Sequence, residues 1–264
     1  TGKSPALTHI TTPGPAGGQP RGNHKLIPPQ HVDALPESEI TIAEILQSRA
    51  YATAHFGKWH LSGGGPGRHG FEYHDGETEN GGPGTYVDPN PKDIFGITKR
   101  GIAFMQEQVA GGKPFYLQLS HYAVHSPPNA LAVTTEEYTK KPTGARHNRV
   151  AHAAMTHDLD TGVGMILDSI ERLGIAVIHY VIFWFDNGAR AGPRKKAFIM
   201  PLSGGKATFW EGGIRVPLVI RGPNVLANVT CHQRVVGFDL FPTLCDLANE
   251  IVIPAGVEGG SLAP

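Results

Sequence analysis

Amphipathic helices and apolar strands alternate along this chain of 264 residues, and the alternation restricts the possible folds more than any other feature. Helical spacing of apolar residues predicts helices over 38–49, 93–109, 150–173 and from about 239 onward. Short apolar runs predict strands over 51–56, 115–120, 177–185 and 216–220. This order predicts an α/β fold, in which a mostly parallel or mixed sheet is sandwiched by helices.

The composition narrows the function classes. The chain has 34 Gly and 22 Pro, well above average usage, which predicts long loops over 1–36 and 62–92. Lys plus Arg and Asp plus Glu are equal at 23 each, so no overall field attracts nucleic acid, and any preference for anions must be local. The chain has no run of 18 apolar residues, so no membrane span is expected.

Polar side chains follow three of the predicted strands at their C-terminal ends. Lys58 and His60 come directly after the first strand, and His125 follows the second. Asp186 and Asn187 end the third. Because ligands of open α/β sheets bind beyond the carboxyl ends of the strands, we expect these side chains to meet in one site.

The chemistry of this set is coherent. Carboxylate and amide oxygens are hard ligands for Ca²⁺ or Mg²⁺, while lysines and protonated histidines stabilise an oxyanion. Each member also has a plainer interpretation, since Asp186-Asn187-Gly188 is a common turn tripeptide and His125 and Lys206 fit solvated loops. The joint occurrence favours a site for a tetrahedral, multiply charged ester.

Four ordered segments resemble motifs of the formylglycine-dependent sulfatases, arylsulfatase-type enzymes of the alkaline-phosphatase superfamily. The first three are Gly57-Lys58-Trp59-His60-Leu61, Tyr122-Ala123-Val124-His125-Ser126-Pro127 and Val181-Ile182-Phe183-Trp184-Phe185-Asp186-Asn187-Gly188. Segment 206–217 matches the motif Lys-x-x-x-Trp-Glu-Gly-Gly-x-Arg-Val-Pro at every fixed position. Departures from the family pattern are Ser62 for Gly, Val124 for Pro, and Trp184-Phe185 for Thr-Ser.

The resemblance implies an alkaline-phosphatase-like fold, hydrolysis of aryl or carbohydrate sulfate esters, and a Ca²⁺ or Mg²⁺ ion held by Asp186 and Asn187. It implies that Lys58, His125 and Lys206 bind the sulfate oxygens, with Lys206 or His125 helping the leaving oxygen depart. His60 would hold the oxidised nucleophile or assist breakdown of the sulfated intermediate.

Two family features have no counterpart in the chain. These are the Cys-x-Pro-Ser-Arg motif that matures to the formylglycine nucleophile, and an Asp pair near the N-terminus that completes the metal site. Thr1-Gly2-Lys3 resembles the segment that closely follows that motif, and 258–264 resembles the segment before the family's small C-terminal domain. We therefore expect residues 1–264 to be a truncated catalytic domain, incomplete at both ends, with the formylglycine upstream. This piece is expected to be inactive and to bind metal weakly.

Two alternatives stay open. One is a phosphomonoester or phosphodiester hydrolase of the same superfamily. The other is a degenerate, non-catalytic anion-binding homologue, which Val124 and Trp184-Phe185 keep in play. The resemblance also implies a small-molecule or saccharide sulfate ester as substrate, a formylglycine-generating or sulfatase-maturing enzyme as partner, and a periplasmic or secreted location. No nucleic-acid partner is expected.

Overall fold

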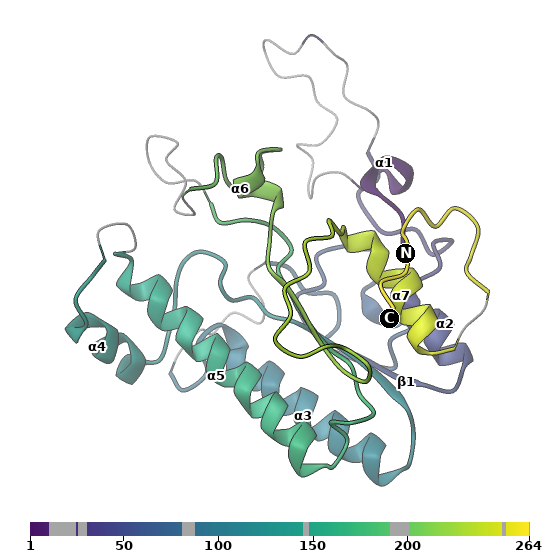
Figure 1. Ribbon diagram of the computed structural model, residues 1–264, viewed down its shortest axis with the longest axis horizontal. Helices are drawn as coiled ribbons and strands as arrows, with labels where there is room; N and C mark the ends of the chain where they lie inside the picture. The colour runs from purple at the N-terminus through teal and green to yellow at the C-terminus, as the bar shows by residue number, and fades with distance from the viewer. Residues whose placement is uncertain are drawn as a thin grey trace.

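The computed structural model describes residues 1–10, 25, 31–80, 88–144, 148–190, 201–249 and 252–263 (Figure 1). The α-helices of this part are α1 (Pro5–Thr8), α2 (Ile42–Ser48), α3 (Ile94–Ala110), α4 (Ala132–Lys140), α5 (Val150–Arg172), α6 (Glu211–Ile214) and α7 (Leu240–Leu247). Its strands are β1 (Ala52–Gly57), β2 (Tyr73–His74), β3 (Phe115–Ser120), β4 (Val181–Trp184) and β5 (Leu218–Arg221). Short 3₁₀ turns are η1 (Pro66–His69), η2 (Pro91–Asp93) and η4 (Gly237–Asp239).

A parallel sheet of three strands, in the order β2–β1–β3, positions the candidate site. The register of β1 and β3 runs from Ala52 opposite Phe115 to Gly57 opposite Ser120. Every residue of β1 is buried, as expected for a central strand with helices on both faces.

Helices cover both faces of this sheet. α3 packs on β1 and β3, with α5 outside it, whereas α2 packs on β1 from the other side and is followed by α7 (Figure 1). Alternate residues of β1 serve the two faces, since Phe56 joins the core with Ile97 and Phe104 of α3, while the His55 ring contacts Phe71 on the α2 side. The predicted α/β sandwich is confirmed.

The third strand end belongs to a different sheet from the first two. Within the described residues, β4 and β5 form a separate antiparallel pair, with Val181 opposite Arg221. The strand predicted over 177–185 begins only at Val181, because Val177 and Ile178 lie in the turn after α5 and are 79% and 67% exposed. Residues 216–217 likewise precede β5 rather than joining it.

The predicted helix boundaries agree with the structure to different degrees. The helices predicted over 93–109 and 150–173 are confirmed to within a residue as α3 and α5. The first helix begins later than predicted, because Thr41 rather than Ser38 is its N-cap. The Thr41 hydroxyl accepts from the Glu44 N–H at 3.2 Å and the Glu44 carboxylate accepts from the Thr41 N–H at 2.7 Å.

Several short elements were not predicted. They are α1, η1, β2, α4 and α6, the first three of which lie in segments predicted as loops. None of the helices in the described ranges is long and apolar enough to cross a membrane.

Candidate functional site

Two predicted side chains follow β1 and a third follows β3 at the same edge of the sheet. Lys58 comes directly after β1, and its N–H donates to the Ser120 carbonyl at 2.7 Å, across to the end of β3. His60 lies two residues further on, and its Nε2 is 3.0 Å from the Glu79 carboxylate. The His125 N–H donates to the Tyr122 carbonyl at 2.9 Å, which turns the chain after β3. The parallel pairing of β1 and β3 thus positions one half of the site.

The other half consists of two segments that bond to each other. The Lys206 N–H donates to the Ala189 carbonyl at 2.8 Å, and the Gly188 N–H donates to the Gly213 carbonyl at 3.0 Å. A Cβ at Gly188 would overlap the Gly212 backbone, lying 2.9 Å from its carbonyl carbon, so only glycine permits this approach. The segment after β4, with Asp186 and Asn187, is therefore joined to the segment of Lys206 by the glycines of two motifs.

Charges of the second half act on groups of the first half, so the two halves lie close together. Burial lowers the pKa of Lys58, the Lys206 ammonium lowers it further, and the Asp186 carboxylate opposes both. Burial also lowers the pKa of His125, where the Ser126 carbonyl opposes the shift and the charges of Lys206 and Lys58 add to it. The structure therefore brings together residues that are far apart in the chain.

His60 shares this electrostatic environment. Burial and the Lys58 charge lower its pKa, while the Glu79 carboxylate acts in the opposite direction and Lys206 adds to the lowering. The protonation of Lys58, His60 and His125 is therefore disfavoured by burial and by neighbouring lysine charges. An anion bound among them would relieve this repulsion, so the cluster suits a small, highly charged anion.

The metal-binding residues predicted from the sequence form only part of a coordination shell. Asp186 is exposed and Asn187 is half-buried, and together they offer carboxylate and amide oxygens. Ca²⁺ takes about 6–8 oxygen ligands and Mg²⁺ about six. Across the described ranges, no three His, Cys, Asp or Glu side chains gather in a way that could hold a metal ion. The donors fit a hard cation in kind but not in number.

Some residues around the site were not predicted. The segment 75–80 contacts the Gly57–His60 stretch through Asp75, Thr78, Glu79 and Asn80, although the sequence indicates only a loop there. Lys92 is 1% exposed, and its charge contributes to the lowered pKa of His125. Neither feature has a periodic or motif signal, since β2 is only two residues long and Lys92 lies in a 3₁₀ turn.

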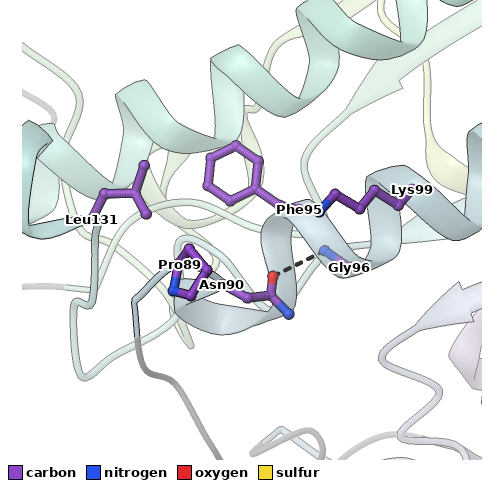
Figure 2. A pocket seen from close by; sticks show the side chains of 6 residues that line it. All are labelled: Pro89, Asn90, Phe95, Gly96, Lys99 and Leu131. Carbon is purple, nitrogen blue, oxygen red and sulfur yellow. Dashed lines mark hydrogen bonds between the residues drawn. The ribbon is translucent and has the colours of Figure 1, made fainter.

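A hollow of about 450 Å³ opens beside the start of α3 and is lined by Pro89, Asn90, Phe95, Gly96, Lys99 and Leu131 (Figure 2). None of the predicted site residues lines it. The Asn90 side chain is engaged within the wall, because its oxygen accepts from the Gly96 N–H at 2.9 Å and its nitrogen donates to Asp93 at 2.7 Å. With Lys99 as its one charged side chain, this hollow is a poorer anion site than the cluster at the sheet edge.

Comparison with known proteins identifies the family. The model of the family described as Sulfatase matches residues 1–250. The chain is 32% identical over 159 residues to a sulfatase of Formosa agariphila, covering 56% of this chain and 28% of that protein. It is 27% identical to the ulvan-active sulfatase of the same organism, covering 87% of this chain and 50% of the relative. Human arylsulfatase A is 27% identical, with 89% of this chain and 53% of that protein covered. The chain thus spans about half or less of the length of these curated relatives.

Solved structures show the same fold at lower identity. The complex of Ps i-CgsB with k-i-k-neocarrahexaose superposes with a TM-score of 0.77 at 21% identity, covering 99% of this chain and 62% of that one. The phosphonate monoester hydrolase SpPMH from Silicibacter pomeroyi superposes with a TM-score of 0.66 at 16% identity, covering 87% and 62%. Together with the family match over most of its length, the shared fold shows that this chain belongs to the sulfatase family.

Proposed function

We propose that the protein containing this chain is a sulfuric ester hydrolase acting on aryl or carbohydrate sulfates. The observation that carries the proposal is the gathering of Lys58, His125 and Lys206, which lie far apart in the sequence. Burial is the main cause of the lowered pKa values of Lys58 and His125, the Lys206 charge adds to both, and the Asp186 carboxylate opposes the shift at Lys58. A cluster of this kind in a sulfatase-family chain suits the binding of a sulfate group.

The proposed roles follow from the chemistry of each group. Lys58 and His125 bind sulfate oxygens, and Lys206 or His125 stabilises the leaving oxygen as charge shifts onto it. His60, held beside Glu79, assists at the nucleophile or in the breakdown of the sulfated species. A positioned cation is worth most where water is excluded, and Lys58 is partly buried.

The proposal includes two groups that the chain does not itself provide. Asp186 and Asn187 would contribute two oxygen ligands to a Ca²⁺ or Mg²⁺ ion, which offsets sulfate charge. Formylglycine, matured from a Cys-x-Pro-Ser-Arg segment of the whole protein, would supply the nucleophile. A sulfatase-maturing enzyme and a location outside the cytoplasm form part of the same proposal.

A phosphate or phosphonate ester hydrolase is the second candidate. It is favoured by the fold shared with a phosphonate monoester hydrolase, and a cation cluster accepts either tetrahedral anion. The match of 206–217 to the sulfatase motif favours sulfate. Parallel assays of nitrophenyl sulfate and nitrophenyl phosphate with the full-length, matured protein decide between the two, and turnover of neither supports the non-catalytic homologue.

Anion binding by this chain tests the site directly. Calorimetric titration with sulfate at low ionic strength should show binding that weakens about tenfold or more in Lys58→Met and in Lys206→Met. The reason is that a charge-assisted hydrogen bond contributes about 1.5–3 kcal/mol. Lys99→Met is the matched control, because it removes one exposed lysine from α3 outside the cluster. Equal weakening in all three variants would show a general charge effect and refute the site.

A further inference from the structure

We propose that Thr78 is a positioning residue for the anion site, because its hydroxyl group fixes the two peptide units on either side of Lys58. This inference rests on the proposed function of the Lys58 cluster. Thr78 lies in the segment after β2, outside the motifs by which the sequence resembles the sulfatases.

The contacts of Thr78 surround Lys58 on both sides. Its Oγ1 donates to the Gly57 carbonyl at 2.6 Å and accepts from the Trp59 N–H at 2.8 Å. The first bond holds the peptide unit before Lys58 and the second holds the unit after it. With both peptide planes held, the direction of the Lys58 Cα–Cβ bond is set, which fixes the point from which the flexible side chain extends.

The same residue also anchors the imidazole of the motif, His60. The His60 N–H donates to the Thr78 main-chain carbonyl at 2.8 Å. The carboxylate of the next residue, Glu79, lies 3.0 Å from the His60 Nε2. One residue of the segment thus orients Lys58 through its side chain and His60 through its backbone.

A second contact fixes the segment itself. Asp75 accepts from the Gly57 N–H at 2.8 Å and from Arg100 of α3 at 2.7 Å, and Arg100 also donates to Asp93 at 2.6 Å. The segment 75–80 is therefore held between the end of β1 and the start of α3. A segment anchored in this way can hold Lys58 and His60 in fixed positions, which a freely moving loop cannot.

The chain offers a matched control at the other end of β1. The Thr53 hydroxyl donates to the Gly70 carbonyl at 2.7 Å and accepts from the Glu72 N–H at 3.1 Å. It makes the same pair of bonds as Thr78 but is placed away from Lys58. Because Thr53 is fully buried, Thr53→Val should lose at least as much stability as Thr78→Val.

The experiment compares sulfate affinity and melting temperature in the wild-type chain and in Thr78→Val, Thr78→Ser and Thr53→Val. We expect Thr78→Val to bind sulfate about tenfold more weakly, and Thr78→Ser and Thr53→Val to stay within about twofold of the wild type. Thr78→Ala replaces Thr78→Val if the valine variant does not fold. If the wild-type chain binds sulfate, equal sulfate affinities in Thr78→Val and Thr53→Val would overturn the inference.

A readout without sulfate separates this inference from the proposed function. The His60 ring titration, followed by NMR, should move up toward its ordinary pKa in Thr78→Val only. Burial and the Lys58 charge lower this pKa, and in the variant Lys58 is no longer held in place, whereas the backbone bond from His60 to residue 78 remains. A wild-type chain that fails to bind sulfate, while this shift still appears, would reject the proposed function and leave the positioning role supported. An unchanged His60 titration in Thr78→Val would reject the positioning role whatever the sulfate result.

Discussion

Gly57 ends β1 directly before Lys58, and replacing it with alanine tests why this motif begins with glycine. Gly57 has a φ of +102°, which L side chains rarely adopt. An added Cβ would collide with the Ser120 carbonyl oxygen and lie 2.8 Å from its carbonyl carbon and 3.0 Å from Ile97 Cδ1. The neighbouring strand β3 would have to move away from the end of β1.

The expected cost has two parts. A non-glycine residue at positive φ costs about 1–3 kcal/mol. Moving Ser120 away would weaken the bonds from the Lys58 N–H to Ser120 and from the Gly57 N–H to Asp75, at about 1 kcal/mol each. The free energy of unfolding of Gly57→Ala should therefore fall by about 3–5 kcal/mol.

Gly112→Ala is the control for the backbone term alone. Gly112 also has a positive φ, of +62°, but nothing lies within 4 Å of an added Cβ, so only about 1–2 kcal/mol should be lost. Urea unfolding of both variants measures the difference, provided that the slope with denaturant is unchanged. If Gly57→Ala costs no more than Gly112→Ala, close approach to Ser120 is not what requires glycine at this position.

Two further predictions concern protons and metal. Burial lowers the pKa of His55 and of His121 to about 4 from 6.5, so both fold as neutral rings. Their contribution to the free energy of unfolding is complete above about pH 6.5. It is lost as the pH falls toward 4, because the rings bind protons in the unfolded state and stay neutral in the folded state. Urea unfolding should therefore show about 2–3 kcal/mol less stability per ring at pH 4.5 than at pH 7, and equal stability at both values contradicts the burial argument. Calorimetry should show Ca²⁺ binding that is weaker than micromolar and that Asp186→Ala abolishes. Asp160→Ala, which removes an exposed carboxylate of α5, is the control and should retain the binding. Micromolar or tighter binding, or binding insensitive to Asp186→Ala, counts against the ligand assignment.

The elements predicted well are those that packing makes periodic. α3 buries Ile94, Ile97, Phe104 and Met105 along one face, and this stripe is visible in the sequence. The missed helix α4 buries only Thr134, so it has no apolar stripe to detect. The start of β4 was placed too early because apolar residues such as Val177 also occur in exposed turns.

The residues of the site also divide into those that the sequence predicts and those that it does not. The rule that ligands bind beyond the carboxyl ends of strands places Lys58 and His125 at one edge of the sheet, and β1 and β3 are adjacent and parallel as this requires. It gives no warning that Asp186 follows a strand of another sheet. Thr78 could not be predicted, since a threonine in a loop carries no pattern and its importance depends on backbone partners about twenty positions away.

The backbone bonds between the segment after β4 and the segment of Lys206 have an electrostatic consequence. Because Gly188 bonds to Gly213 and Lys206 bonds to Ala189, the carboxylate of Asp186 and the ammonium of Lys206 are carried on one structural unit. Their effects on Lys58 are opposite in sign, so the unit acts on Lys58 as a dipole. When the unit moves as a whole, both contributions to the pKa of Lys58 change together, and because their signs are opposite the two changes partly cancel.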